Sequence, residues 1–299
     1  MTDNRGFTLI EAVAVIVITG ILAGVVAVFI AKPVQGYVDT VRRAALSDIA
    51  DGALRRIGRE VRTAVPNSIR VDATNRYLEF IPTNDGVRYR AEQTAGVGNI
   101  LDFTLSSTET SFDVFGVSPV SATANDYLVI FNTGQCSNGG CTAPNPCVGA
   151  NAYEGCNRRT LTGTSTTLSG GASYGTGVSF TATANPLPFD SPGHRVNFVP
   201  STGPVIFACE GVGTVGTTGT GTLKRYTGYA TGAGTWNPSA LPTSGLGTGT
   251  LLADSISACT FTYAAGVTAR SGLLTLSLTI SRSGESVTLY HEVHVDNQP

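Results

Sequence analysis

The chain opens with a long run of apolar residues. Between Phe7 and Ala31 the only charged side chain is Glu11. A helix of this length measures about 37 Å, which is enough to cross a hydrocarbon core about 30 Å thick. A secretory signal peptide would have a shorter apolar region, about 7–15 residues long, before its cleavage site. The pattern therefore predicts a membrane-spanning helix over 7–31, preceded by a leader over 1–6 that stays cytoplasmic.

A second helical pattern follows the apolar run. Pro33 is expected to interrupt or kink the helix, and three glycines each weaken it by about 1 kcal/mol. Apolar residues then recur every three or four positions until Pro66, which predicts an amphipathic helix over 32–66. The expected buried stripe consists of Val34, Val38, Val41, Ala45, Ile49, Ala53, Ile57, Val61 and Val65.

From residue 67 the apolar period changes to two, as expected for strands. Two hairpins are predicted, one pairing 76–82 with 87–92 across a Thr-Asn-Asp-Gly turn and one pairing 272–281 with 286–295. The fold class is therefore α+β, a long N-terminal helix followed by an antiparallel β-sheet head with long loops over 67–299. The other expected strands are 68–73, 100–105, 111–116, 127–132, 158–168, 176–182, 194–199, 204–209, 223–229 and 256–264.

Residues 211–250 are rich in glycine and threonine. A phosphate-binding loop is excluded because the Gly-Lys-Ser/Thr ending is missing. Low complexity of this kind favours a mobile surface insertion or a decorated hairpin.

Composition narrows the possible partners. The chain has 299 residues, 13% of them charged, and a net charge of −2, so no nucleic-acid partner is expected. Five arginines could nevertheless suggest DNA binding. Because acidic residues alternate with them, a solvated helix face paired with Asp48, Asp51 and Glu60 is the favoured interpretation. These arginines are Arg55, Arg56, Arg59, Arg62 and Arg70.

Glu11 is unusual, because a charge inside a membrane span costs about 2.5–3.5 kcal/mol. One interpretation places the carboxyl near the interface, where it snorkels or becomes protonated. The other gives it a cationic partner within the membrane, such as the N-terminal amine of a neighbouring chain.

Arg5 to Glu11 resemble the class III signal of type IV pilins and type II secretion pseudopilins. The resemblance implies that a prepilin peptidase cleaves after Gly6 and methylates the new N-terminus at Phe7. It further implies that Glu11 pairs with the amine of an adjacent subunit during assembly. The implied partners are this peptidase, membrane lipid, other pilins or pseudopilins in a filament, and an inner-membrane assembly platform.

Residues 31–71 and 255–299 resemble, more narrowly, minor pilin-like proteins of the mannose-sensitive haemagglutinin (MSHA) pilus system, with Lys32 as a departure. This implies a structural role in pilus initiation or at the tip. The head would lie in the periplasm, anchored by one inner-membrane span, and then at the cell surface. The alternatives are a J-like minor pseudopilin of a type II secretion system, and a tip adhesin or DNA-capturing subunit.

The six cysteines are expected to form disulfides if the head lies in an oxidising compartment. Cys209 and Cys259 both lie in strand-like segments and are candidates to link two strands. The other four fall in a cysteine-rich loop over 134–158, where the pairing stays open and the spacing does not match a zinc site. These four are Cys136, Cys141, Cys147 and Cys156.

Candidate catalytic chemistry is sparse. His291-Glu292-Val293-His294 is one residue shorter than His-Glu-x-x-His, and on a strand its two histidines face opposite sides. His194 has no obvious partner. We therefore expect a structural protein and no enzyme, cofactor or metal.

Overall fold

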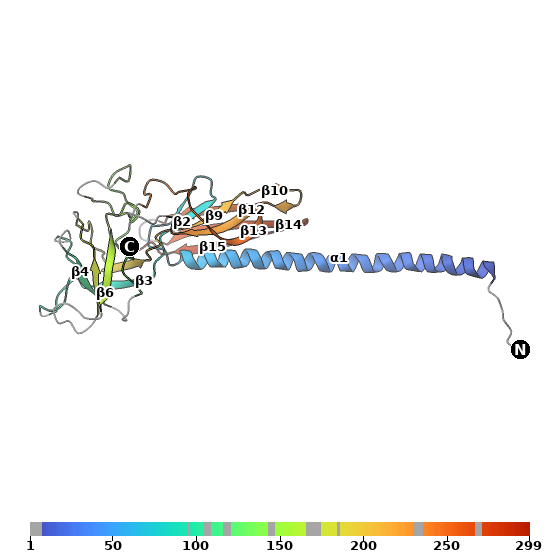
Figure 1. The fold of residues 1–299 in the computed structure, drawn as a ribbon, viewed down its shortest axis with the longest axis horizontal. Helices are drawn as coiled ribbons and strands as arrows, with labels where there is room; N and C mark the ends of the chain where they lie inside the picture. Colours follow the sequence, from blue (N-terminus) through green and yellow to red (C-terminus); the bar gives the residue numbers. More distant parts are fainter. Residues whose placement is uncertain are drawn as a thin grey trace.

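The computed structural model describes residues 8–94, 96–104, 109–115, 121–142, 147–165, 175–183, 186–229, 236–266 and 271–299. One helix, α1 (Leu9–Val61), is 53 residues long, or about 80 Å. Its first half projects alone from the head, and it continues through Pro33 as one rod (Figure 1). The predicted α+β class is confirmed.

The described part of the head is built mainly from a sheet and a barrel. A seven-stranded antiparallel sheet has the order β1-β2-β9-β12-β13-β14-β15, and a closed barrel has the order β3-β4-β7-β6-β5-β8. The strands of the sheet are β1 (Arg70–Val71), β2 (Tyr77–Phe80), β9 (Val205–Glu210), β12 (Gly221–Thr227), β13 (Thr250–Ala264), β14 (Gly272–Arg282) and β15 (Glu285–Val295). Those of the barrel are β3 (Asp85–Tyr89), β4 (Ser111–Phe115), β5 (Tyr127–Ile130), β6 (Arg158–Ser165), β7 (Thr176–Phe180) and β8 (Arg195–Val199). A short pair, β10 (Thr214–Val215) and β11 (Thr218–Gly219), forms a separate ribbon.

The sheet packs one face against the second half of α1. Alternate residues of β14 are buried on this face, including Leu276 and Leu278, opposite Leu46 and Ile57 of the helix. The predicted stripe is right for Ala53, Ile57 and Val61 but wrong before residue 46. Val34, Val38 and Val41 belong to the part of α1 that extends beyond the head, and they are exposed.

The predicted C-terminal hairpin is confirmed. β14 and β15 pair in register from Gly272↔Val295 to Arg282↔Glu285. Ser283 and Gly284 between them both have positive φ, 52° and 87°, as a tight two-residue turn of the right twist requires.

The predicted hairpin of 76–82 with 87–92 is wrong. β2 pairs with β1 and β9, whereas β3 pairs with β4 and β8. At the expected turn the chain passes from the sheet into the barrel, because Asp85 already pairs with Phe198 of β8. The barrel over 85–199 is thus an insertion between two neighbouring strands of the sheet. The strand expected at 100–105 is also wrong in its described part, since residues 100–104 form no strand.

The Gly/Thr-rich segment is not simply a surface insertion. Its residues 221–227 form β12, a central strand between β9 and β13, and Leu223 is fully buried. A Cβ at Gly219 would lie 2.2 Å from the backbone oxygen of Ser255, and one at Gly221 would lie 2.8 Å from that of Ile256. Glycine is needed there because two backbones approach closely.

Candidate assembly site on the N-terminal helix

The first turn of α1 is closed by a cap. Thr8 has extended backbone angles (φ −82°, ψ 150°), and its Oγ1 accepts a hydrogen bond from the backbone N–H of Glu11 at 3.4 Å. Glu11 lies three positions after the cap, where a carboxylate also interacts favourably with the positive end of the helix dipole. The interpretation of the sequence missed this role for Thr8, although Thr-x-x-Glu is a known signal for it.

Glu11 is surrounded by exposed apolar side chains. Leu9 is 85% exposed and Ile10 is 75% exposed. The next charge along the helix is Lys32, about 32 Å away at 1.5 Å per residue. The apolar part of the stem between these two charges therefore matches the thickness of a hydrocarbon core.

The head covers none of this apolar surface. The most apolar window of α1 has no buried residue and is long enough to cross a membrane. An exposed apolar surface this large indicates a segment that contacts lipid or other proteins. The predicted cleavage residues Gly6 and Phe7 lie outside the described residues.

The second half of α1 is fixed to the sheet. Glu60 accepts hydrogen bonds from Arg56 at 3.1 Å and from Arg225 of β12 at 2.8 Å. Arg43 forms an ion pair with Glu285 at the start of β15. Ion pairs as well as apolar contacts therefore hold the second half of α1 against the sheet.

The arginine cluster is only partly paired as predicted. Arg55 contacts Asp51 at 2.7 Å, Arg56 contacts Glu60, and Arg70 pairs with Glu79 of β2. Within the described residues, no acidic side chain forms an ion pair with Arg59 or Arg62.

Arg70 and Glu79 belong to a cluster between the sheet and the barrel. Burial raises the pKa of the Glu79 carboxyl, and the Arg70 guanidinium opposes that shift. Arg70 Nη2 also donates to the carbonyl of Asn237 at 2.7 Å, and its guanidinium lies 3.8 Å from the centre of the Tyr153 ring. Trp236, next to Asn237, is 3% exposed and packs against Tyr153.

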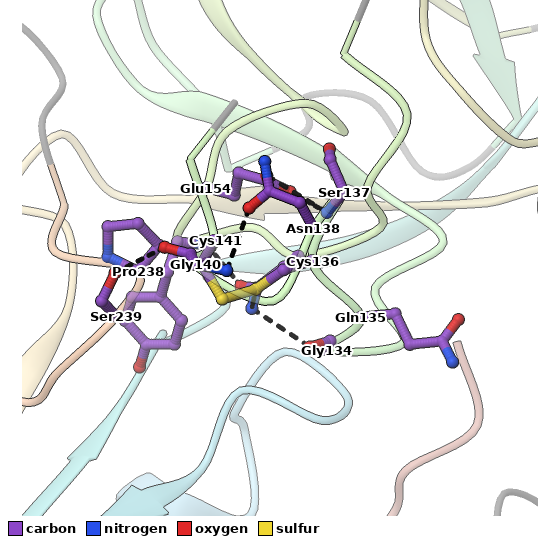
Figure 2. The surroundings of a disulfide bond; sticks show 12 residues. Gly134, Gln135, Cys136, Ser137, Asn138, Gly140, Cys141, Glu154, Pro238 and Ser239 are labelled. Atoms are coloured by element: carbon purple, nitrogen blue, oxygen red, sulfur yellow. Dashed lines mark hydrogen bonds between the residues drawn. A yellow bond between two sulfur atoms is a disulfide. The ribbon is translucent and has the colours of Figure 1, made fainter. Parts of the chain in front are cut away.

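The cysteine-rich loop contains two disulfides that join cysteines close in the sequence, Cys136–Cys141 and Cys147–Cys156. Figure 2 shows the first, with the backbone N–H of Ser137 donating to Glu154 and the Ser239 hydroxyl donating to the Gly140 carbonyl at 2.9 Å. These contacts tie the loop to its neighbours in a stretch with few apolar side chains.

The third disulfide joins Cys209 of β9 to Cys259 of β13. These strands do not pair with each other, because β12 lies between them in the sheet. Both cysteines belong to the core under α1.

The histidines do not converge. His291 faces α1 and His294 is exposed on the other side of β15, while His194 lies near Asp190, 3.5 Å from its carboxylate. Among the described residues, no three His, Cys, Asp or Glu side chains are grouped as metal ligands would be.

Comparison with known families adds to this geometry. Residues 1–27 match the model of the prokaryotic N-terminal methylation motif. Searches of curated proteins and of solved structures find no match. The motif indicates a type IV pilin-like or pseudopilin-like precursor, a structural subunit that is processed by a prepilin peptidase and assembles with other pilins. Together with the apolar helix it indicates membrane anchoring.

Proposed function

We propose that the chain is a minor pilin-like structural subunit of an MSHA-type pilus, similar to MshO, and that it acts in pilus initiation or at the tip. The observation that carries the pilin-like part of the proposal is the methylation motif at residues 1–27, continued by the exposed apolar first half of α1 with one carboxylate. The resemblance over 31–71 and 255–299 supports the MSHA-type pilus. The proposed parts are a leader (1–6), a membrane and filament-core helix (7–31), an amphipathic helix (32–66) and a periplasmic head (67–299).

In the proposed mechanism, the peptidase cleaves between Gly6 and Phe7, and the apolar helix waits in the membrane. Glu11 then pairs with the methylated amine of a neighbouring subunit as both leave the lipid for the filament. Pairing in a low-dielectric core is strong because neither charge is screened by water. The cost of placing Glu11 in lipid supports this step, since a lone carboxylate there favours any subunit that brings a cation.

The position of the barrel supports the initiation or tip role. The barrel lies beyond the C-terminal end of α1, roughly on the helix axis and opposite the N-terminus (Figure 1). In a filament built from parallel helices, this volume is where another subunit's head would stack. A subunit at the end of the filament has no such neighbour.

A J-like minor pseudopilin of a type II secretion system is the second candidate, because the same motif serves both systems. The resemblance over 31–71 favours the pilus. Deleting the gene and then measuring surface pili and protein secretion separates the two: loss of pili with normal secretion supports the pilus, and the reverse result supports the secretion system.

Charge pairing by Glu11 is tested against its capping role. Glu11→Gln keeps the size of the side chain and removes its charge, whereas Thr8→Ala removes the cap and keeps the carboxylate. We expect both variants to insert and to be cleaved, and only Glu11→Gln to be lost from sheared filaments. Normal incorporation of Glu11→Gln, or equal loss of both variants, would show that the pairing step is wrong.

A further inference from the structure

Three arginines form a stripe along α1 where the helix passes the last strand of the head. Arg55, Arg59 and Arg62 follow one another at spacings of four and three residues, so they share one side of the helix. With Gly58 and His291 they line a groove of about 510 Å³. All three arginines are exposed, and of the three only Arg55 has an acidic partner among the described residues, Asp51.

The groove runs beside a free sheet edge. β15 pairs with β14 on one side and, among the described strands, with none on the other. Its 11 residues therefore leave a row of backbone N–H and C=O groups available for another strand.

The helix and this edge run in the same direction. Arg43 pairs with Glu285 at the start of β15, and Gly58 lies against His291 and Val293 near its end. The arginine stripe therefore flanks the last part of the edge strand.

We propose that this groove binds an extended acidic segment of a partner protein, which adds as a strand to β15 and directs its carboxylates at the arginine stripe. The arginines rise by about 6 and 4.5 Å along the helix. Alternate residues of a strand lie about 6.6 Å apart on one face, which flexible arginines can match. Aspartate or glutamate at every second position is the pattern that fits, with the backbone pairing supplying affinity.

The surroundings favour a peptide over a nucleic acid. Arginines also bind phosphates, but a phosphodiester backbone cannot pair with the edge of β15. Arg62 also lines an adjoining groove to which Asp85 and Asp296 contribute. A continuous polyanion along the stripe would meet these carboxylates, whereas a short peptide avoids them.

The test uses the full-length protein in detergent micelles and a fluorescent peptide of alternating glutamate and threonine. We expect saturable binding by fluorescence anisotropy, weakened about tenfold or more in Arg59→Glu/Arg62→Glu. Arg88→Glu, which changes an exposed arginine of β3, is the matched control and should bind like the wild type. Unchanged Trp236 fluorescence verifies that each variant is folded.

Backbone pairing is tested with the same peptide N-methylated at alternate residues, in both registers. The peptide methylated in one register should lose binding, because its methyl groups replace the N–H donors on the peptide edge that faces β15. Equal binding of both registers, no binding of the parent peptide, or arginine-dependent binding of a DNA duplex instead of the peptide would each overturn the proposal. None of these assays uses cleavage or filament assembly, so failure here leaves the proposed function standing. The inference adds the chemistry of a partner to that function.

Discussion

Gly58 of α1 lies directly against His291 of β15. A Cβ on Gly58 would be 3.0 Å from His291 Nε2 and 3.2 Å from Val293 Cγ2. The glycine that weakens the isolated helix thus allows the helix to approach the sheet. Gly52, six residues earlier, has no atom within 4 Å of its Cβ position, so it offers a matched comparison.

We predict that Gly52→Ala raises the free energy of unfolding by about 0.5–1 kcal/mol, since alanine is the better helix former. Gly58→Ala should fall short of that gain by about 1 kcal/mol or more, because its methyl group must push aside the side chains of His291 and Val293. Thermal unfolding of the full-length variants in detergent measures the difference. Equal gains at the two positions would mean that the helix does not approach β15 as closely as described.

The disulfides should contribute unequally to stability. Cys209–Cys259 closes a separation of 50 residues and Cys136–Cys141 one of 5. Chain entropy then predicts a loss of about 4 kcal/mol when the first pair is replaced by alanine and about 2 kcal/mol for the second.

Unfolding of the two double-alanine variants under oxidising conditions gives both losses. A larger loss from the loop pair would contradict the expectation that Cys209–Cys259, which closes the longer loop, stabilises the head more.

The pairing of Arg70 with Glu79 can be broken from one side or from both. Arg70→Met leaves Glu79, which is 1% exposed, buried without its counter-charge, and should cost about 3–5 kcal/mol. Arg70→Met/Glu79→Gln should recover part of that loss. Emission of Trp236, the only tryptophan, should shift to longer wavelength in the single variant, because Arg70 no longer holds the carbonyl of Asn237. If the single and double variants are equally stable, the two residues are not coupled.

Glu109 provides a pH dependence. Burial raises the pKa of its carboxyl to about 7, although the backbone N–H of Asp102 donates to it at 3.0 Å. The unfolded value is about 4.3, so the folded state binds the proton more tightly and this group lowers stability as the pH rises from about 4.3 to about 7.

We therefore predict that Glu109→Gln is more stable than the wild type by about 1–2 kcal/mol near pH 8, a figure reduced because the carboxyl is only half-buried. Below pH 4 the two proteins should be nearly equal. A difference that does not change between these pH values would contradict the raised pKa.

The features that sequence predicted well are encoded locally. An unbroken apolar run marks the stem, and alternation around Ser283-Gly284 marks the last hairpin, because neighbouring residues decide both. The second half of the helix was predicted with its buried face partly misplaced. Spacing gives the period of a helix but does not show where the sheet begins to cover it, and burial starts at Leu46.

The barrel was not predicted, since nothing local distinguishes a hairpin from a crossing between two sheets. Residues 83–86 have the composition of a turn, yet β2 pairs with β9 far along the chain. The sequence predicts a strand near 223–229 but assigns it to a surface insertion or a decorated hairpin, because the close approach that requires Gly219 and Gly221 is a tertiary contact. At the candidate site, the assembly role of Glu11 stays a prediction, and the sequence interpretation does not include the Thr8 cap.

The most direct test of the account is the mature N-terminus of the protein from its own cells, measured by mass spectrometry of the N-terminal peptide. The account predicts that the peptide begins at Phe7, carries one methyl group on its amine, and reverts to the uncleaved form in Gly6→Leu. A chain that retains Met1 to Gly6, or that begins elsewhere, would contradict the pilin-like processing on which the proposed function rests.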